Sequence, residues 1–476
     1  MKICLNDRIF SILSEVLDKE EKEGYVIGGF VRDSLLGRDN PGMDIDVLVI
    51  GNGIDIAKKV ARRLGKDVNV TVFKNFGTAM CKSGNYEIEF VGARKESYDR
   101  GSRKPVVENG TLEDDQNRRD FTINAMAACL NSSRFGELVD PFNGRSDLEK
   151  KIIKTPLDPD KTFDDDPLRM MRAIRFATQL NFEIEKRTFD SIIRNAGRIN
   201  IISGERIITE LNKIILCERP SRGFVLLEKS GLLAIIFPEL DRMKGVEKID
   251  GKAHKDNFLH SIKVLDNISR KTDDLWLRWA ALLHDIAKPV TRKYTPETGW
   301  SFHGHEFLGS KMVPSIFRKL KLPLNDKMKY VQKLVDLHLR PIVLSQEEVS
   351  DSAVRRLLFE AGDDIDDLMM LCEADITSKN EEKKTRHLEN FKLVRQKLKE
   401  IEEKDAVRNF KPPINGDEII SIYGIKPGRE VGIIKNAIRE AILDGVIPNE
   451  YEAARQIMMK TAASLGLSEI RIANES

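Results

Sequence analysis

Two acidic residues, Asp44 and Asp46, stand one residue apart at the start of the apolar run DIDVLVI, residues 44–50. Such a run predicts a short buried strand, and residues i and i+2 of a strand point to the same side of the sheet. Two carboxylates held side by side repel each other unless a cation lies between them. Hard oxygen ligands at this spacing suit Mg²⁺, which also binds substrate phosphates. The alternative is a solvated strand start, so the pair predicts a metal site only together with neighbouring signals.

The stretch before this strand contains a second signal, the pair Gly28 and Gly29 in YVIGGFVRDSLLG. The pattern predicts a strand, a tight turn and the first turn of a helix, where glycines let a phosphate approach the backbone. Free N–H groups at the start of a helix attract anions, and Arg32 adds a fixed positive charge. With the acidic pair, this segment predicts metal-dependent nucleotidyl transfer, in which metal ions bind the attacking and leaving oxygens.

Four motifs follow one another along the chain: GGFVRDSLLG, DIDV, RRDFTINAMA at residues 118–127 and DDPLRMMRAIRFA at residues 165–177. In this order they resemble the class II tRNA nucleotidyltransferases, the CCA-adding enzymes, which share their head with bacterial poly(A) polymerases. The resemblance implies a polymerase-β-like head with Asp44 and Asp46 as catalytic Mg²⁺ ligands. It also implies Arg118, Arg119 and Asp120 around the triphosphate and ribose, Asn124 as a candidate sugar contact, and Asp166 with Arg169 at the base. Gly28, Gly29 and Arg32 of the turn complete the predicted nucleotide-binding set.

Arg118 and Arg119 have an alternative interpretation. Adjacent residues diverge by ~100° on a helix, so one arginine could bind phosphate while the other supports the fold. A salt bridge to an acid would equally explain either of them.

Asp166 and Arg169 stand three residues apart, which predicts that they share one face of a helix. The carboxylate offers hydrogen-bond acceptors and the guanidinium a planar set of donors. Cytosine and adenine present an amino donor beside a ring-nitrogen acceptor, whereas uracil and guanine present a carbonyl beside a ring N–H. The pair therefore matches C or A, the role of protein template that the resemblance implies, although Asp165 stands where the family has Glu. Alternatively, Asp165 and Asp166 cap a helix beginning at Pro167.

Two further acids have weaker signals. RIITEL, residues 206–211, resembles the next motif of the family, in which Arg206 and Glu210 would brace the templating helix. Without the family, this pair is an ordinary i,i+4 surface salt bridge worth roughly a few tenths of a kcal/mol. Glu89 in YEIEFVGAR is a candidate third acid near the metals, or else a solvent-facing strand residue.

Most of the seven histidines gather in one interval of the sequence: His254, His260, His284, His303, His305 and His338. Their order, with the His-Asp pair in HDIAKP and an aspartate in LCEADITS, predicts one or two divalent metals held between helices. The pattern resembles the HD phosphohydrolases, which implies His260, His284, Asp285 and Asp375 for a first metal and His305 and His338 for a second. The metal would be Mn²⁺, Mg²⁺, Ni²⁺ or similar, and His303 competes with His305 as a ligand.

The C-terminal stretch GDEIISIYGIKPGREVGIIKNAIREAILDGVIPNEYEAA also resembles the C-terminal part of tRNA nucleotidyltransferases. Its KPGR turn, Lys435 and Arg439 are candidate contacts to the phosphates of a tRNA acceptor stem, since RNA helices are recognised by shape and backbone. Charges of a solvated helix are the alternative.

The positioning elements follow from periodicity and length. The chain of 476 residues predicts several domains: a nucleotidyltransferase head (1–150), a helical neck (151–245), an HD domain (246–385) and a helical tRNA-binding tail (386–476). Strands are expected at YVIGG, DIDVLVI, NVTVF, TAMCK and YEIEFV, with a helix over 5–22 and another over 54–64. The predicted fold class is α+β multidomain, with a small mixed sheet in the head and all-helical domains after it.

Composition excludes several classes of protein. The chain has 78 basic and 76 acidic residues, so RNA contacts must come from local basic patches. Five cysteines without CxxC pairing argue against a disulfide framework or a zinc ribbon. No apolar run approaches the ~18 residues of a membrane span, and the N-terminus lacks a secretory core. We expect a cytoplasmic protein with no membrane partner, and the sequence leaves its oligomeric state open.

Together these signals predict a CCA tRNA nucleotidyltransferase that adds CMP and AMP from CTP and ATP to tRNA without a template, with an HD phosphohydrolase attached. A poly(A) polymerase, or an enzyme adding only A or only CC, is the alternative within the same class. An HD phosphohydrolase with a non-catalytic RNA-binding head is the alternative from another class.

Overall fold

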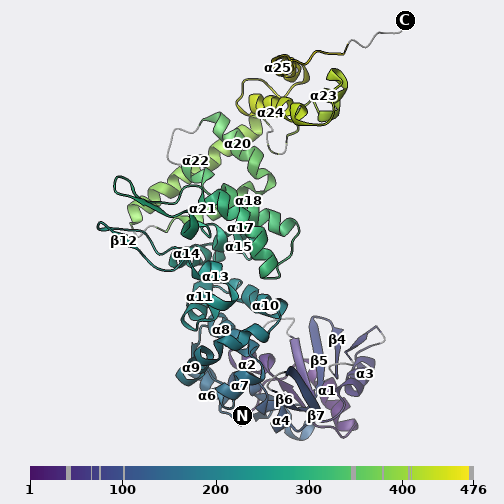
Figure 1. Ribbon diagram of the computed structural model, residues 1–476. Helices are drawn as coiled ribbons and strands as arrows, with labels where there is room; N and C mark the ends of the chain where they lie inside the picture. Colours follow the sequence, from purple (N-terminus) through teal and green to yellow (C-terminus); the bar gives the residue numbers. More distant parts are fainter. Residues whose placement is uncertain are drawn as a thin grey trace. The chain divides into compact units, whose positions relative to one another are not determined.

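The computed structural model describes residues 1–38, 44–65, 67–73, 77–99, 102–344, 350–377, 380–405, 408 and 410–470. The chain divides into two compact units, residues 1–241 and residues 242–476 (Figure 1). Within the described residues, no helix combines the length and the apolar character that a membrane crossing requires.

The first unit begins with a seven-stranded sheet in the order β3-β4-β5-β2-β1-β8-β9. β2 is parallel to β5 and antiparallel to β1, and α3 packs on β4 and β5. The elements are α1 (Arg8–Lys19), β1 (Gly24–Ile27), α2 (Gly29–Leu35), β2 (Asp44–Val49), α3 (Gly53–Leu64), β3 (Val70–Phe73), β4 (Thr78–Ser83), β5 (Tyr86–Gly92), β6 (Arg94–Asp99), β7 (Ser102–Asn109), α4 (Leu112–Asn117), α5 (Thr122–Ala125), β8 (Ala127–Cys129), β9 (Leu138–Val139) and α6 (Gly144–Glu149).

The predicted strands of this sheet are confirmed, and β2 shows why they form. Ile45, Val47, Leu48 and Val49 are fully buried, while Asp44 at the start of the strand is exposed. The β6–β7 hairpin and strands β8 and β9 were not predicted, because the alternation of apolar and polar residues is weak in them.

Helices dominate the rest of the first unit. They are α7 (Pro159–Asp165), α8 (Leu168–Leu180), α9 (Lys186–Asn195), α10 (Gly204–Ile215), α11 (Pro220–Lys229), α12 (Leu232–Ile236) and α13 (Pro238–Asp241), with the short parallel pair β10 (Ile152–Ile153) and β11 (Glu183–Ile184). α8 packs against α10 and α11 and buries most of its residues, and it ends where Asn181 takes a left-handed conformation (φ 59°).

The second unit is helical with two small hairpins. Its elements are β12 (Lys248–Ile249), β13 (Lys252–Ala253), α14 (Asn257–Ser269), α15 (Leu275–Leu283), α16 (Lys288–Thr291), β14 (Lys293–Thr295), β15 (Gly299–Ser301), α17 (His305–Lys319), α18 (Asp326–Leu337), α19 (Arg340–Leu344), α20 (Asp351–Ala361), α21 (Ile365–Asp375), α22 (Glu381–Asp405), α23 (Gly416–Tyr423), α24 (Arg429–Leu443) and α25 (Tyr451–Ser464). Helices α23, α24 and α25 lie next to one another (Figure 1). They enclose an apolar core of their own, centred on Ile434, Ile438 and Met458. The predicted mixed sheet followed by helical regions is confirmed, and the short strand pairs of the helical regions are additions to it.

A buried ion pair joins α8 to α10. Arg175 Nε lies 2.6 Å from Glu210 Oε2, and the two side chains are 10% and 5% exposed. Arg175 also donates to Gln179 at 3.0 Å. Removing one partner of such a pair leaves an uncompensated charge in the interior.

Glu210→Gln is therefore expected to lower the stability of this helix pair by about 3 kcal/mol. Hydrogen exchange of the α8 and α10 amides in the full chain measures this local change. Asp190→Asn, which removes an exposed i,i+4 partner of Lys186, is the control and should cost less than about 0.5 kcal/mol. Equal protection of the amides in both variants would contradict a stabilising role for the buried pair.

Candidate functional site

The glycine turn and the acidic pair meet in one cavity of the first unit, with a volume of about 670 Å³. Gly28 precedes α2, and Asp44 and Asp46 begin the neighbouring strand β2, which pairs with β1 so that Asp46 lies opposite Ile27. The cavity is lined by Gly28, Gly29, Phe30, Arg32, Asp33, Asp44, Asp46, Arg119, Asp120, Asn124, Arg172, Arg175 and Phe176. Residues far apart in the sequence thus form one polar pocket.

Gly28 is required by both conformation and space. Its φ of 84° lies in the left-handed region, which side chains other than glycine rarely adopt. A Cβ atom at this position would lie 3.3 Å from Asp46 Oδ2 and 3.2 Å from Arg119 Nη1. Any side chain here would therefore enter the space between the acidic pair and the arginine.

Asp46 shows the electrostatic signature of a site for a cation. Burial has the largest effect and, with the neighbouring carboxylates of Glu89 and Asp44, raises the pKa of Asp46 to about 6 against the lowering effect of Arg119. Glu89 lies opposite Asp46 on β5, is exposed, and is not part of the cavity wall. A divalent cation beside Asp46 would offset this accumulation of negative charge, so the residues present fit a metal ion.

A hydrogen-bond network fixes the polar wall of the cavity. Arg32 Nη1 donates to Asn124 Oδ1 at 2.8 Å, and Asn124 Nδ2 donates to Asp120 Oδ1 at 3.2 Å. Arg172 Nε donates to Asp120 Oδ2 at 2.7 Å. Burial opposes the charged form of Asp120, but Arg172 and Asn124 hold its pKa below the usual range. Asp120 and Asn124 therefore orient arginines at the cavity.

Arg118 and Arg119 both pair with one buried acid, Asp115, which the sequence analysis missed. Arg118 Nε lies 2.8 Å from Asp115 Oδ1, and Arg119 Nε lies 3.1 Å from Asp115 Oδ2. Only Arg119 of the two forms part of the cavity wall. The salt-bridge interpretation thus applies to both arginines, and the i,i+3 and i,i+4 spacing from Asp115 was the signal that could have revealed it.

Helix α8 contributes further cavity residues that were not predicted. Arg172, Arg175 and Phe176 lie within the motif quoted above, and the repeat of arginines at i, i+3 and i+6 from Arg169 was the available signal. The Phe176 ring has three guanidinium carbons around it, at 3.8 Å for Arg175, 5.1 Å for Arg32 and 5.4 Å for Arg172. These cations place positive charge on one side of the pocket, and each of them also pairs with an acid: Arg32 with Asp33, Arg172 with Asp120 and Arg175 with Glu210.

Asp166 and Arg169 do not share a helical face, which corrects the prediction. α8 begins only at Leu168, and Asp166 has an extended backbone (φ −141°) between α7 and α8. Asp166 Oδ1 accepts from the Leu168 amide at 3.1 Å, so the capping alternative holds for Asp166, whereas Asp165 is the last residue of α7. Arg169 Nη2 donates to the carbonyl of Arg118 at 2.7 Å, and neither side chain is part of the cavity wall.

Arg206 and Glu210 contact different partners instead of each other. Arg206 Nη2 lies 3.0 Å from Asp166 Oδ2, and Glu210 pairs with Arg175, as described above. Through these two contacts, α10 holds Asp166 and helix α8, which carry the proposed base-reading residues. Their role as a brace stays a prediction, and this geometry supports it.

The predicted tail residues lie on α24. Arg439 Nη2 donates to Glu440 at 2.9 Å, and its guanidinium carbon lies 5.8 Å from the centre of the Phe359 ring. Within the described part of the chain, Lys435 makes no ion pair, so of these two cations it is the one that remains available to a phosphate.

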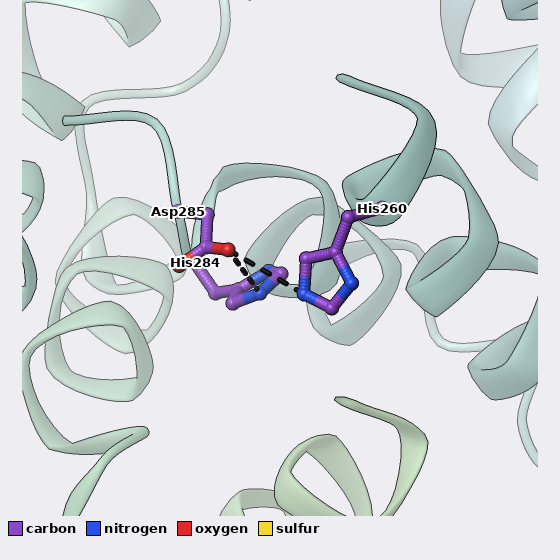
Figure 2. A group of neighbouring side chains, drawn as sticks. All are labelled: His260, His284 and Asp285. Atoms are coloured by element: carbon purple, nitrogen blue, oxygen red, sulfur yellow. Dashed lines mark ion pairs between the residues drawn. The ribbon is translucent and has the colours of Figure 1, made fainter. Parts of the chain in front are cut away.

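In the second unit, Asp285 is the centre of a buried cluster of imidazoles (Figure 2). Its Oδ2 lies 3.2 Å from His284 Nε2 and 3.5 Å from His260 Nε2. Its Oδ1 lies 3.2 Å from His305 Nε2 and 3.9 Å from His338 Nε2. Each carboxylate oxygen thus faces a different pair of histidines, and the cluster forms two candidate metal sets that share Asp285.

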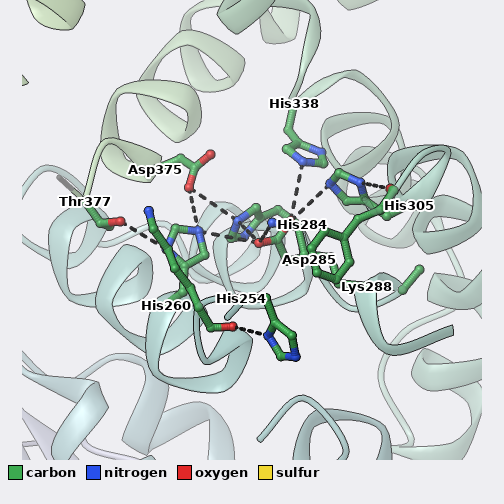
Figure 3. A network of polar contacts seen from close by, with 12 residues as sticks. His254, His260, His284, Asp285, Lys288, His305, His338, Asp375 and Thr377 are labelled. Atoms are coloured by element: carbon green, nitrogen blue, oxygen red, sulfur yellow. Dashed lines mark hydrogen bonds and ion pairs between the residues drawn. The ribbon is translucent and has the colours of Figure 1, made fainter. Parts of the chain in front are cut away.

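Backbone carbonyls fix the tautomers of these histidines (Figure 3). The Nδ1 atoms of His284, His305 and His338 each lie 2.7–2.8 Å from a carbonyl three residues earlier. With Nδ1 as the donor, Nε2 carries a free lone pair, and all three Nε2 atoms are buried without a hydrogen-bond partner. Buried unsatisfied nitrogens that converge on a carboxylate fit a divalent metal.

Asp375 completes the first set. Its Oδ1 lies 2.8 Å from His260 Nε2 and 3.6 Å from His284 Nε2. Burial disfavours the charged form of His284, but in the metal-free chain Asp285 and Asp375 outweigh it and raise its pKa to about 10, so a metal ion at Nε2 would take the place of a proton. Burial and the neighbouring His284 lower the pKa of His338 to about 3.

The structure distinguishes the two candidate histidines at 303 and 305. His305 is buried against Asp285, whereas His303 is exposed and belongs to neither set. Lys288, which was not predicted, donates to Asp285 Oδ2 at 2.6 Å.

Known proteins share both halves of this arrangement. Residues 24–154 match the poly A polymerase head domain, residues 181–244 match a probable RNA and SrmB-binding site of polymerase A, and residues 257–439 match the HD domain. An A-adding tRNA nucleotidyltransferase from Deinococcus radiodurans is 34% identical over 352 residues, which cover 72% of this chain and 78% of that protein. The chain belongs to the tRNA nucleotidyltransferase family.

Two other similarities agree with membership of this nucleotidyltransferase family. A multifunctional CCA protein from Pseudoalteromonas atlantica is 32% identical over 367 residues, or 74% of this chain and 84% of that protein. The CCA-adding enzyme of Bacillus stearothermophilus, solved in complex with CTP, has the same fold, with a TM-score of 0.67, 23% identity and coverage of 97% and 99% of the two chains. The resemblance seen in the motifs and the enzyme class are confirmed.

Asp46→Asn tests the head cavity of this nucleotidyltransferase. The raised pKa means that the folded state favours the protonated acid, so its charge destabilises the fold above about pH 6 and ceases to do so near pH 4. We expect the variant to lose nucleotide incorporation yet to be about 1 to 3 kcal/mol more stable than the parent in EDTA at pH 8. Thermal unfolding of both proteins measures this difference in stability, with Asp190→Asn as a control. An unchanged stability in Asp46→Asn would contradict the conclusion that the charge of Asp46 destabilises the metal-free fold.

His305→Ala and His303→Ala form a matched pair for the second unit. Since His305 belongs to a candidate metal set and His303 does not, we expect only His305→Ala to lose about one divalent ion per chain. Elemental analysis of the full chain after equilibration with Mn²⁺ measures the ion content. The same loss in both variants would refute the assignment.

Proposed function

We propose that the first unit adds CMP and AMP, taken from CTP and ATP, to the 3′ end of tRNA without a nucleic-acid template. The observation that carries this proposal is the single cavity that combines the acidic pair, the glycine turn and the guanidinium groups of Arg32, Arg119 and Arg172. Acids for metal, space for phosphate and cations for negative charge are the three requirements of nucleotidyl transfer.

Each group of residues in the head cavity has its own role in this proposal. Asp44 and Asp46 hold the metal, for which Mg²⁺ is the proposed ion, and the turn at Gly28 and Gly29 leaves room for the triphosphate. Mg²⁺ supplies charge neutralisation at the phosphates and lowers the pKa of the attacking hydroxyl. Arg119 and Arg172 stabilise the negative charge that builds up on the phosphate oxygens, and Asp120 keeps Arg172 in position.

Base selection by Asp166 and Arg169 remains part of the proposal. In the structure, Asp166 pairs with Arg206, and Arg169 donates to the carbonyl of Arg118. Base reading therefore requires both side chains to exchange these partners for a nucleotide. The gain is the pairing with C or A described above, and unmatched groups against U or G would cost roughly 1 to 3 kcal/mol each.

The remaining parts have supporting roles in the proposal. The neck, residues 151–245, carries the base-reading segment, and the tail, residues 386–476, contacts tRNA through Lys435. Action on tRNA agrees with a cytoplasmic location.

We further propose that the HD domain, residues 246–385, hydrolyses phosphoesters. The support is the pair of candidate metal sets that share Asp285. A divalent ion such as Mn²⁺, Mg²⁺ or Ni²⁺ supplies a water of lowered pKa there. His260, His284, Asp375, His305 and His338 hold the ions, and Lys288 holds negative charge near Asp285.

A narrower activity, addition of A alone, is the second candidate. It is favoured by the 34% identical relative, which is named an A-adding tRNA nucleotidyltransferase. Both activities use the same cavity and differ in the tRNA end and the nucleotides that they accept.

Nucleotide-by-nucleotide addition separates the candidates. With tRNA that lacks its 3′ CCA, we expect incorporation of two C and then one A. UTP and GTP should be at least about tenfold poorer substrates, because the hydrogen-bonding groups of their bases do not match those of Asp166 and Arg169. A tRNA that ends in CC is the matched substrate for the A-adding reaction. Gel analysis of end-labelled tRNA resolves the products.

The outcomes are distinct. Extension of only the CC-ending tRNA by one A would replace the proposal by the A-adding candidate, and long A tracts would replace it by a poly(A) polymerase. Undiminished addition by Asp44→Ala would show that the head is not the catalytic unit and would favour an HD phosphohydrolase with a non-catalytic head.

A further inference from the structure

A cavity of about 610 Å³ adjoins the histidine cluster of the second unit. His260 and Asp375, two of the metal-holding residues, form part of its wall, and so does Thr377, whose hydroxyl lies 3.1 Å from His260 Nδ1 (Figure 3). A substrate that reaches the cluster through this cavity therefore contacts the rest of the wall. The nature of that wall indicates which substrate fits.

Positive charge predominates on the wall. It includes Lys252, Lys255 and Lys288, and Asp375 is the only acid among the described residues that line the cavity. Lys288 is paired with Asp285, but Lys255 makes no ion pair within the described part of the chain, and Lys252 Nζ donates only to the carbonyl of Pro296 at 2.9 Å. Two lysines are thus available for an anion, as a phosphate requires.

An aromatic surface faces the same space. Trp300 of β15 lines the cavity, and its ring is held in place because Nε1 donates to the carbonyl of Lys252 at 3.1 Å. His254 and Tyr294 contact this ring at centroid distances of 5.0 Å and 5.2 Å. A rigid indole binds a flat partner without first losing side-chain entropy.

Phe302 connects this surface to the metal-holding residues. Its ring lines the cavity, with Lys288 Nζ 5.7 Å from the ring centre, and its carbonyl is the group 2.7 Å from His305 Nδ1. Aromatic rings and free lysines therefore lie on one wall that is continuous with the cluster. A phosphoester without a base would use the lysines and leave the rings unused.

We propose that this cavity is a nucleotide subsite, in which the base stacks on Trp300 and the phosphate binds Lys252 and Lys255, so that the HD centre selects nucleoside phosphoesters over base-free ones. This inference rests on the phosphohydrolase function proposed above. With a nucleoside 2′,3′-cyclic phosphate, the oxygen of one water bonds to phosphorus, one ribose P–O bond breaks, and the leaving oxygen takes a proton, which gives the monophosphate. Trp300 forms no covalent bond and is a specificity-determining residue.

The test compares adenosine 2′,3′-cyclic phosphate with the 2′,3′-cyclic phosphate of methyl riboside, which has the same ring and no base. For the full chain with Mn²⁺, kcat/KM is expected to be about tenfold higher for the nucleotide. Trp300→Ala should reduce this ratio about tenfold, through KM of the nucleotide. Trp276→Ala, a tryptophan outside this cavity, is the matched control and should keep the parental ratio.

Calorimetric binding of adenosine 2′,3′-cyclic phosphate in EDTA adds a readout that needs no hydrolysis. We expect Trp300→Ala to weaken this binding about tenfold, whereas Trp276→Ala should not. Hydrolysis of neither substrate by the parent would reject the phosphohydrolase function, and the binding result would still decide the subsite. A ratio near one in the parent, equal losses on both substrates in Trp300→Ala, or unchanged binding in that variant would overturn the proposal.

Discussion

A carboxylate removed from water needs cations or hydrogen-bond donors around it, and this constraint governs both units of the protein. In the first unit, Asp115 and Asp120 are buried and collect arginines. In the second unit, Asp285 is 1% exposed and collects four imidazoles and the amino group of Lys288. The polar groups of each site are held in place by the acids that they surround.

The groups that lack a partner are the ones that fit a metal: Asp46 in the first unit and the imidazole Nε2 atoms around Asp285 in the second. Asp46 has a raised pKa mainly because it is buried, and Glu89 and Asp44 add to this effect while Arg119 opposes it. The buried Nε2 atoms around Asp285 have lone pairs and no donor to satisfy them. An ion would complete either arrangement, whereas the fully paired Asp120 has no need of one. Fully paired acids such as Asp120 thus stabilise the fold around each site, and buried groups without a partner indicate where a metal ion would bind.

Helix α8 contributes both to the head cavity of the first unit and to the packing of its neck helices. Its arginines extend into the head cavity, while its apolar residues and the Arg175–Glu210 pair anchor it to α10 and α11. Phe176 belongs to both environments, because its ring is nearly buried and yet contacts the guanidinium groups of the cavity. Positioning of nucleotide-binding groups and packing of the neck are therefore properties of the same helix.

The sequence by itself determined the residue types and the local elements: the strand that presents Asp44 and Asp46, the glycine turn, the helical second half, and the family to which the chain belongs. These follow from periodicity, turn chemistry and ordered motifs, which are local properties. The sequence could not show which charges pair. Arg206 contacts Asp166 and Glu210 contacts Arg175, across helices, although spacing suggested a pair between Arg206 and Glu210. The sequence also could not choose His305 over His303, place Asp166 outside the helix, or show that Trp300 and two lysines line the cavity beside the histidine cluster. Burial, helix starts and contacts between distant segments are decided only when the elements pack together.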